Sequence, residues 1–465
     1  MSYVSRQYIS LSKMIFILGE GLFIFGGIAL GSALLVPGGL KPLEMVEASW
    51  MRILLVVMVI QVSLYLNDMY ENYLSENFVH LSACLIQSVG AASIVLSFIY
   101  FLWPSFMIGR WVFLGSIVLL VILMVLWRVF YLYVMQKRLF TEKAIILGDG
   151  ELAKDIFDEI GKQGNSGYQV KYVFGGGKGQ TGIPVFNGVP VRKDFHRLGD
   201  IAKSEGISSI IVALDQRRGV MPFKELLDCK VRGITIVDGG SFYERTTGRI
   251  LVERINPSSL IFCDGFRKQP VSRIVKRLVG VLVATVLTIL LCPFMIVIAL
   301  AIKLDSQGPV IFCQERVGEN GKIFTLYKFR SMKANAERES GPVWAQENDP
   351  RITRVGKVLR KLRLDELPQV WNVLKGDMSF VGPRPERPHF VNELKQVIPY
   401  YEERLSVKPG VTGWAQIKYP YGANEHDAME KLKYDLYYIK NMSILLDMTV
   451  IFHTAKIVLL GRGSR

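Results

Sequence analysis

The chain has few of the residues that build disulfides and zinc sites. It contains five cysteines and five histidines among 465 residues. The cysteines are odd in number, widely spaced and without a Cys-x-x-Cys pair; they are Cys84, Cys229, Cys263, Cys292 and Cys313. We therefore expect free thiols in a reducing compartment, where cysteine packs as a small hydrophobic residue. The dispersed histidines likewise argue against a zinc site.

Other common features are also missing. The sequence has no internal repeat and no low-complexity tract. Its first apolar run is too long for the hydrophobic core of a signal peptide and lacks a small-residue cleavage site, so we expect no cleaved leader. Acidic residues are fewer than basic ones: the chain has 41 Asp and Glu against 56 Lys and Arg, which gives a formal net charge of +15.

That charge suits either a nucleic-acid binder or a protein that lies on anionic lipid and handles phosphorylated substrates. Half of the residues are hydrophobic and the mean hydropathy is +0.28, which is unusual for a soluble protein. We therefore expect a membrane protein that has membrane lipid as a partner and binds no nucleic acid. At this length two or three domains are expected, because a single core stops growing well before this size.

Four long apolar stretches fill residues 1–140, and we interpret them as transmembrane helices. They are Ile15–Pro37, Ile53–Leu66, Val79–Trp103 and Trp111–Met135. A span needs roughly 20 residues, which the second stretch reaches only with its flanks. An even number of spans returns the chain to its starting side. Basic residues predict that this side is the cytoplasm. They are Arg6, Lys13, Lys137, Arg138 and Lys143 on this side, against Lys41, Arg52 and Arg110 on the other.

Residues 141–255 predict a Rossmann-like α/β domain. Short apolar strands are expected at Lys143–Leu147, Ser209–Ala213 and Ile234–Asp238, with helical segments between them. Alternation of strands and helices is typical of a parallel sheet.

A glycine-rich turn follows the first of these strands. Gly148 and Gly150, with Ala153, match the spacing of a dinucleotide-binding fingerprint, so the two glycines are candidate cofactor-binding residues. The acidic residue expected about 20 positions later is not clearly placed, because Tyr172–Lys178 stands there instead. A cofactor site and a degenerate scaffold or regulatory domain therefore both stay open.

A fifth apolar run, Val279–Ile302, follows a linker at 256–271 and is interrupted by Pro293. Proline removes a backbone hydrogen bond and bends or breaks a helix. A kinked spanning helix is one interpretation. We favour a re-entrant hairpin at 274–303, because basic residues flank both ends of the run and a hairpin keeps the domains before and after it in the cytoplasm. These residues are Lys268, Arg273, Lys276, Arg277 and Lys303.

Two adjacent carboxylates, Asp365 and Glu366, precede a helix that Pro368 is expected to begin. Acids at a helix start often only compensate the helix dipole. Here Arg384 follows, held rigidly between Pro383 and Pro385 as a phosphate clamp would be. One acid could then be a nucleophile that attacks phosphorus, while the other holds Mg²⁺ against the phosphates.

More basic residues crowd this region. They are Arg351, Arg354, Lys357, Arg360, Lys361 and Arg363 ahead of the carboxylates, and Lys328 and Arg330 after a predicted strand at Ile323–Tyr327. Each could contact phosphate, or lie at a strand end or on a solvated or lipid-facing surface. In the last third of the chain, Trp414 suits a pocket wall or an interfacial anchor. Asp427 and Asp435 read as charges on a helix face.

With these residues in view, residues 272–465 closely resemble the bacterial sugar transferase domain. This domain belongs to the monotopic polyprenyl-phosphate phosphoglycosyl transferases, which begin exopolysaccharide, O-antigen and capsule synthesis. The matching motifs are Lys276-Arg277, Gly308–Val310, Gln314–Gly318, Lys328–Met332, Asp349–Gly356, Leu364–Asn372, Gly376–Glu386 and Lys408–Gln416. The whole chain resembles the large members, which carry four membrane helices and a Rossmann-like domain. Ser259–Gly265 resembles the exopolysaccharide subgroup, with Cys263 where that subgroup often has serine.

The resemblance implies a reaction and an architecture. Asp365 would attack the sugar-bearing phosphate of a UDP-sugar and release UMP, and undecaprenyl phosphate would then take the phosphosugar from the enzyme. Glu366 would coordinate Mg²⁺, Arg384 would bind phosphate, and Pro293 would break the re-entrant helix. The expected protein is a homodimer in the bacterial inner membrane, multi-pass, with its catalytic domain on the cytoplasmic face. Glucose or galactose is the expected sugar.

Three other functions are compatible with parts of this pattern. A membrane-bound nucleotide-sugar dehydratase needs a second glycine fingerprint and a Tyr-x-x-x-Lys pair, and that spacing occurs here only at Tyr133–Lys137, at the end of a membrane helix. A metal-dependent glycosyltransferase would be expected to show a DxD motif, which the sequence lacks. A non-catalytic scaffold of polysaccharide assembly is disfavoured by the intact Asp365-Glu366 pair.

Overall fold

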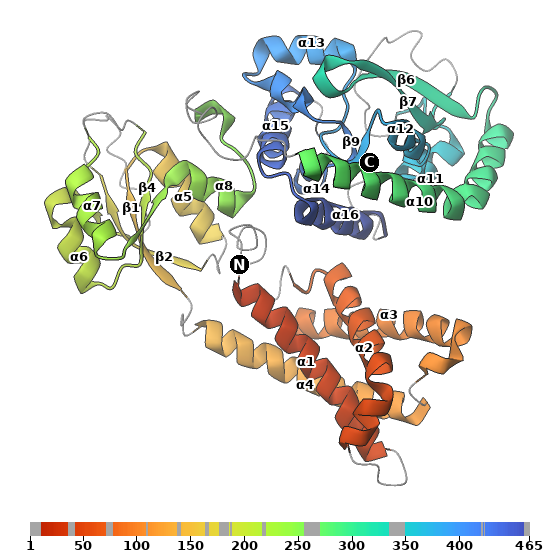
Figure 1. Cartoon of the computed structure of the whole chain (residues 1–465), viewed down its shortest axis with the longest axis horizontal. Coiled ribbons are helices and arrows are strands. Elements are labelled where there is room, and N and C mark those ends of the chain that lie inside the picture. The colour runs from red at the N-terminus through yellow and green to blue at the C-terminus, as the bar shows by residue number, and fades with distance from the viewer. Residues whose placement is uncertain are drawn as a thin grey trace. The chain divides into compact units, whose positions relative to one another are not determined.

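The computed structural model describes residues 11–35, 42–70, 78–107, 110–136, 141–162, 167–175, 186, 188–215, 220–254, 270–333, 349–419, 422 and 424–459. The chain divides into two compact units, Met1–Glu142 and Lys143–Arg465. The ribbon of each unit is drawn in Figure 1. The predicted linker at 256–271, apart from 270 and 271, and the Ser259–Gly265 segment lie outside the described residues.

The first unit is built from apolar helices that coincide with the four predicted stretches. They are α1 (Leu11–Leu35), α2 (Pro42–Leu66), α3 (Phe78–Leu102) and α4 (Arg110–Gln136), with a short 3₁₀ turn η2 (Pro104–Phe106). Among the described residues, Met14–Gly31 and Ser82–Leu102 are long and apolar enough to cross a membrane by length and composition. The apolar parts of α2 and α4, Trp50–Leu66 and Leu119–Tyr131, are shorter.

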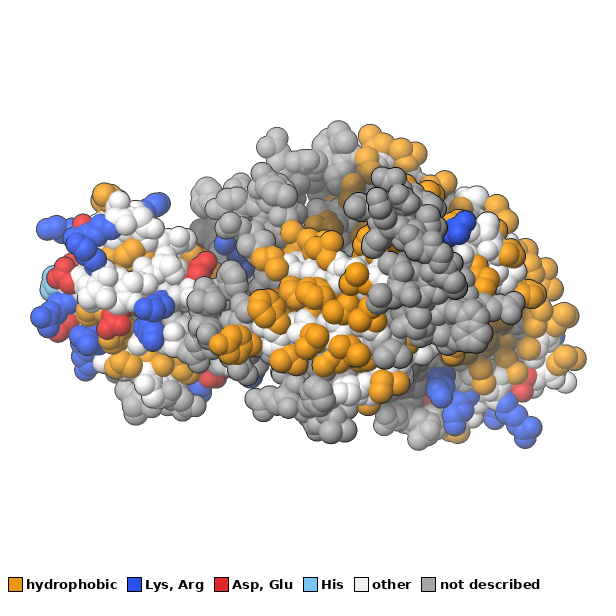
Figure 2. All heavy atoms as spheres, turned by 90° about the horizontal axis from the view of Figure 1, so that it is seen from below, with side chains coloured by type: hydrophobic (Ala, Val, Ile, Leu, Met, Phe, Trp, Pro, Cys, Tyr) orange, Lys and Arg blue, Asp and Glu red, His pale blue; other side chains and the backbone are white. Residues whose placement is uncertain are grey.

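Each of these helices has a buried and an exposed apolar face. Ile24, Leu64 and Leu96 are buried in the bundle core, whereas Leu22 and Phe101 are exposed. Figure 2 shows hydrophobic side chains gathered over this unit, in contrast to the charged side chains over the α/β domain. The core also contains an ion pair between Arg128 Nη2 and Glu20 Oε1 at 2.7 Å, which joins α1 to α4. Apolar side chains exposed on the outside of a bundle that holds a buried ion pair are typical of a membrane protein.

The second unit opens with a five-stranded sheet of strand order β3-β2-β1-β4-β5. The strands are β1 (Glu142–Leu147), β2 (Tyr168–Phe174), β3 (Val191–Arg192), β4 (Ser209–Val212) and β5 (Thr235–Asp238). The register is parallel, with Ile146 opposite Ile211 and Ile211 opposite Val237. The predicted Rossmann-like parallel sheet is therefore confirmed.

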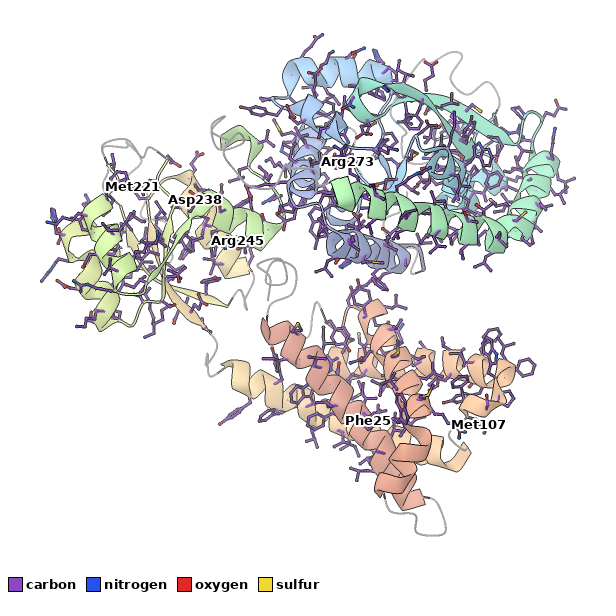
Figure 3. The ribbon with its side chains drawn as sticks, in the orientation of Figure 1. Phe25, Met107, Met221, Asp238, Arg245 and Arg273 are labelled. Atoms are coloured by element: carbon purple, nitrogen blue, oxygen red, sulfur yellow. The ribbon has the colours of Figure 1, made fainter. Side chains whose placement is uncertain are left out.

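Helices cover both faces of this sheet because β1 is buried on both sides. They are α5 (Glu151–Lys162), α6 (Leu198–Ser204), α7 (Phe223–Val231) and α8 (Gly239–Thr247), with the 3₁₀ turns η3 (Phe195–Arg197) and η4 (Val252–Arg254). Ile145 packs with Leu226 of α7 on one face, and Ile146 packs with Ile156 of α5 on the other. Asp238 caps α8, since its Oδ2 accepts from Ser241 N at 3.0 Å (Figure 3).

The rest of the second unit is a mixed domain. Its elements are α10 (Pro270–Asp305), β6 (Ile311–Val317), η5 (Glu319–Gly321), β7 (Ile323–Phe329), α11 (Arg354–Lys361), η6 (Leu364–Glu366), α12 (Gln369–Lys375), β8 (Ser379–Val381), α13 (Pro388–Val397), η7 (Tyr401–Ser406), β9 (Gly410–Thr412), α14 (Trp414–Lys418), α15 (Glu425–Lys440) and α16 (Ile444–Leu459). Strands β6 and β7 form an antiparallel hairpin, and β8 pairs with β9 in parallel.

The fifth apolar run lies within α10. The basic residue Arg273 lies in the first turn of this helix (Figure 3). Residues 273–305 are long and apolar enough to cross a membrane by length and composition. Pro293 lies inside this helix, and the α10 ribbon changes direction in its second half (Figure 1). Both halves pack on the same domain, Ala284 against Val373 and Ile298 against Phe329.

Candidate active site

The carboxylate pair lies in η6, a single turn between α11 and α12. Thr353 caps the start of α11, where its hydroxyl accepts from Gly356 N at 3.0 Å. Arg363 adopts a left-handed backbone with φ of 54°, which prevents α11 from continuing into the carboxylates. Leu364 and Leu367, on either side of the pair, pack against the core around Phe329. Asp365 and Glu366 are thus carried on a short turn that hydrophobic packing holds on both sides.

Glu366 is the most strongly paired acid of the site. Its Oε1 accepts from Arg384 Nη2 at 2.8 Å and from Lys328 Nζ at 3.2 Å. Burial alone would raise the pKa of Glu366, but the charges of Arg384 and Lys328 outweigh burial and hold that pKa below its usual range. Burial in turn lowers the pKa of Lys328, which the charge of Glu366 opposes. Glu366 is therefore ionised at neutral pH.

Asp365 has a different environment although it is the next residue. Burial raises the pKa of its carboxyl, the charge of Lys328 opposes this effect, and the neighbouring Glu366 carboxylate adds to it. Adjacent carboxyls whose pKa values are moved in opposite directions are a sign that the two groups have separate chemical roles. The pair therefore fits the predicted division between a nucleophile and a metal ligand.

Arg384 reaches Glu366 from the turn that follows β8. Pro383 and Pro385 are buried on either side of it, and Arg384 itself is half-buried. The turn starts where β8 and β9 approach closely, since a Cβ on Gly410 would lie 2.1 Å from Gly382 N. Glycine at position 410 allows the two backbone segments to come this close. Their close approach places the Pro-Arg-Pro turn where Arg384 reaches Glu366.

Of the other predicted phosphate ligands, Arg330 and Arg351 are placed elsewhere. Arg330 is 4% exposed, and its guanidinium donates to the carbonyls of Pro309 at 2.6 Å and Ser306 at 2.7 Å, so it secures the end of α10. Arg351 forms a bidentate pair with Asp349, at 2.8 and 2.6 Å. Arg354 is exposed in the first turn of α11. The structure thus brings Lys328 and Arg384, and neither Arg330 nor Arg351, into contact with Glu366.

Two residues from the last third of the chain are buried against other elements. Asp435, interpreted from the sequence as a charge on a helix face, lies on α15, is 2% exposed and pairs with Arg404 Nη2 at 2.9 Å. Trp414, a candidate pocket wall or interfacial anchor, is buried and donates to the Gly248 carbonyl at 2.7 Å. In both cases the helix packs against another element of the second unit, which a local pattern of charged residues does not reveal.

The acid pair can be set against the ligands that Mg²⁺ requires. Among the described residues, no group of three or more His, Cys, Asp or Glu side chains comes together. Mg²⁺ needs no such cage, because it is usually held by one or two carboxylates together with substrate phosphates and water. Glu366 supplies such a carboxylate, so the site fits an ion that the substrate helps to bind.

The glycine turn of the Rossmann-like domain is lined with acids. Gly148 has φ of 135°, which favours glycine over other residues. The Asp215 carboxylate lies only 1.9 Å from where a Cβ of Gly150 would be, and Asp149 stands 2.5 Å from a Cβ of Gly175. Carboxylates therefore lie close to Gly150 and Gly175.

Comparison with known proteins gives two family matches and several relatives. Residues 271–461 match the bacterial sugar transferase family, and residues 65–230 match a CoA-binding domain. The chain is 43% identical over 240 residues to the UDP-N-acetylgalactosamine-undecaprenyl-phosphate N-acetylgalactosaminephosphotransferase of Aeromonas hydrophila, covering 52% of this chain and 56% of that protein. It is 31% identical over 342 residues to the undecaprenyl-phosphate galactose phosphotransferase of Salmonella typhimurium, covering 70% of this chain and 69% of that protein.

A third relative is the exopolysaccharide production protein PSS of Rhizobium leguminosarum, which is 41% identical over 189 residues, covering 39% of this chain and 93% of that protein. The chain spans about half the length of the Aeromonas relative, at 56%.

The CoA-binding match does not agree with the residues at the glycine turn. Coenzyme A carries a diphosphate, which a helix N-terminus and open glycines would bind. Here Asp149, Glu151 and Asp215 surround the start of α5 and would repel it. We therefore assign no step to coenzyme A.

The sugar transferase match contains every residue of the acid site, and the aligned segments cover more than two thirds of the Salmonella and Rhizobium relatives. The chain belongs to the bacterial sugar transferase family.

Proposed function

We propose that this protein transfers a hexose 1-phosphate from a UDP-sugar to undecaprenyl phosphate and releases UMP. This would be the first membrane step of exopolysaccharide, O-antigen or capsule synthesis. The observation that carries the proposal is the acid site, where Glu366 is held by Lys328 and Arg384 with Asp365 beside it. The names of the Aeromonas and Salmonella relatives support the same transfer.

The proposed reaction has two displacements. In the first, an oxygen of the ionised Asp365 carboxylate bonds to the sugar-bearing phosphorus, the bond from that phosphorus to the bridging oxygen breaks, and UMP leaves with the electron pair. In the second, a phosphate oxygen of undecaprenyl phosphate bonds to the same phosphorus. The bond to Asp365 then breaks, and the carboxylate is restored.

The other residues of the site have supporting roles in this proposal. Lys328 and Arg384 would neutralise phosphate charge and hold the diphosphate in line with Asp365. Glu366 would hold Mg²⁺ with the substrate phosphates, and the bound ion would supply further charge neutralisation. Because Glu366 is already oriented by two cations, this arrangement would be preformed before substrate arrives.

A UMP-release assay on a panel of UDP-sugars tests the proposal. We expect one or a few donors, containing glucose, galactose or their N-acetyl forms, to give about one UMP per enzyme without acceptor, as covalent catalysis requires. Addition of undecaprenyl phosphate should give continuous turnover, and removal of Mg²⁺ with EDTA should stop it. UDP as the product would instead indicate a direct glycosyl transfer, and no nucleotide release from any donor would contradict the proposal.

We also propose four transmembrane helices and a re-entrant α10 in the bacterial inner membrane. Support comes from the ends of α10, which bond to one domain. Near its start Arg277 Nη2 donates to the Leu374 carbonyl at 2.8 Å, and at its end Asp305 Oδ2 accepts from Val355 N at 3.0 Å. A straight span would carry these ends to opposite sides of the bilayer, about 30 Å apart. The homodimer stays a prediction.

Labelling of two cysteines tests this topology. Cys313 is exposed on β6, after α10, and Ser105 is exposed between α3 and α4. In a chain whose other cysteines are alanine, we expect Cys313 in intact cells to resist a membrane-impermeant maleimide until the membrane is permeabilised. A matched chain with Ser105→Cys as its single cysteine should react at once. Equal labelling of Cys313 in intact cells would mean that α10 spans the bilayer.

A further inference from the structure

The two prolines that flank Arg384 can form backbone hydrogen bonds only through their carbonyl groups. Pro383 and Pro385 have no backbone N–H to donate. All three carbonyls of the turn accept a hydrogen bond. The Pro383 oxygen accepts from Gly410 N at 2.9 Å, the Arg384 oxygen from Arg404 Nη2 at 3.1 Å, and the Pro385 oxygen from Arg316 Nη1 at 2.9 Å.

The donor to Arg384 is itself fixed at every nitrogen. Arg404 lies in η7 and is 7% exposed. Its Nε and Nη2 donate to Asp435 Oδ2 at 3.1 and 2.9 Å, and its Nη1 donates to Tyr401 Oη at 2.6 Å. Asp435 comes from α15 and is 2% exposed, so the ion pair between Arg404 and Asp435 is buried. A guanidinium held in this way offers Arg384 a rigid donor.

The contacts form a chain that leads to the acid site. Asp435 orients Arg404, Arg404 bonds to the main chain of Arg384, and the side chain of Arg384 bonds to Glu366 Oε1 at 2.8 Å. Arg404 contacts the main-chain carbonyl of Arg384. The guanidinium at the other end of the Arg384 residue is the group proposed to bind phosphate. A shift of the carbonyl would therefore move the guanidinium without removing it.

We propose that Arg404, anchored by Asp435, is a positioning residue for Arg384 in donor binding. This inference rests on the proposed function, because Arg384 is the group that would meet the diphosphate of the UDP-sugar. A merely structural ion pair would instead stabilise the fold whether or not Arg384 is present. The two roles make different predictions for a double-mutant cycle.

The experiment measures donor binding by isothermal titration with the UDP-sugar that the wild type cleaves. All variants are full-length and carry Asp365→Asn, so that no donor is consumed. We expect Arg404→Lys to weaken donor binding about tenfold while Arg384 is present, because small misplacements of a binding group have large effects. In an Arg384→Ala background, we expect Arg404→Lys to change donor affinity less than twofold, within the error of a cycle between non-interacting groups.

Two controls protect the interpretation. Lys440→Gln breaks another ion pair of α15, to Glu244 at 2.7 Å, without touching the turn, and should leave donor affinity unchanged in both backgrounds. If Arg404→Lys does not fold, Asp435→Asn loosens the same guanidinium and carries the same expectation. Equal losses of affinity with and without Arg384 would overturn the inference alone. A wild type that cleaves no UDP-sugar would overturn the proposed function and this inference together.

Discussion

Replacing Asp365 with asparagine is expected to abolish UMP release and the covalent intermediate together. Asparagine keeps nearly the same shape and one acceptor oxygen but cannot act as a nucleophile. We expect the rate of UMP release to fall on the order of a thousandfold or more, as losses of a nucleophile do in other covalent enzymes. The measurement is UMP release in single-turnover conditions, with mass spectrometry of the intact, acid-quenched protein to detect the phosphosugar on the wild type.

A matched control makes the same substitution, aspartate to asparagine, at a position far from the acid pair in sequence. Asp228 on α7 pairs with Arg232 at 2.7 Å and is half exposed in the Rossmann-like domain. Asp228→Asn should leave both UMP release and the adduct at wild-type levels. An Asp365→Asn variant that still shows the adduct would place the covalent bond on another residue. One that keeps full turnover without an adduct would show direct attack by undecaprenyl phosphate.

The structure favours Asp365 over Glu366 as the nucleophile on electrostatic grounds. Glu366 already shares its Oε1 between two cations, which lowers its pKa and occupies the lone pairs of that oxygen. For Asp365 the direction is opposite, because burial raises its pKa and thereby its basicity. A more basic oxygen is a better nucleophile once it is ionised, and Lys328 favours the ionised form.

Much of the fold could be predicted from local patterns. The five apolar runs became helices, and the strands around Lys143–Leu147 and Ser209–Ala213 became neighbours in a parallel sheet, because each pattern depends on residues close together in the chain. The acid pair was found in the same way. Asp365, Glu366 and the Pro-Arg-Pro turn are short motifs that carry their own chemistry.

The contacts that could not be predicted from the sequence join residues that are distant along the chain. Arg330 is two positions from Lys328, and nothing in the segment predicts that one meets Glu366 while the other closes the end of α10. Arg404 acts on a carbonyl 20 residues away, and Asp435 is 31 residues beyond Arg404. Gly148 and Gly150 left a cofactor site and a degenerate scaffold both open, and the carboxylate that lies beside Gly150 belongs to Asp215, which follows a different strand.

The second large effect is expected for Glu366→Gln. Glutamine retains an oxygen that can accept from Arg384 and Lys328, so the geometry of the turn should survive. It removes the negative charge that a magnesium ligand needs, and it leaves the two cations without their shared counter-charge. We expect UMP release at saturating donor to fall by roughly a hundredfold or more, the scale at which loss of preorganised charge acts in other enzymes.

Magnesium dependence separates a metal-binding role from a purely electrostatic one. If Glu366 holds the ion, the Mg²⁺ concentration for half-maximal UMP release should rise at least about tenfold in Glu366→Gln, as losses of metal-site partners do. Glu393→Gln is the matched control, since Glu393 is exposed on α13 and pairs only weakly with His389 at 3.2 Å across the helix surface. A hundredfold slower Glu366→Gln enzyme with an unchanged Mg²⁺ requirement would assign Glu366 to orienting Arg384 and Lys328 and would move the ion to Asp365 and the substrate phosphates. A variant with the wild-type rate would remove Glu366 from the site altogether, and the two cations would then have to bind donor phosphate without an internal counter-charge.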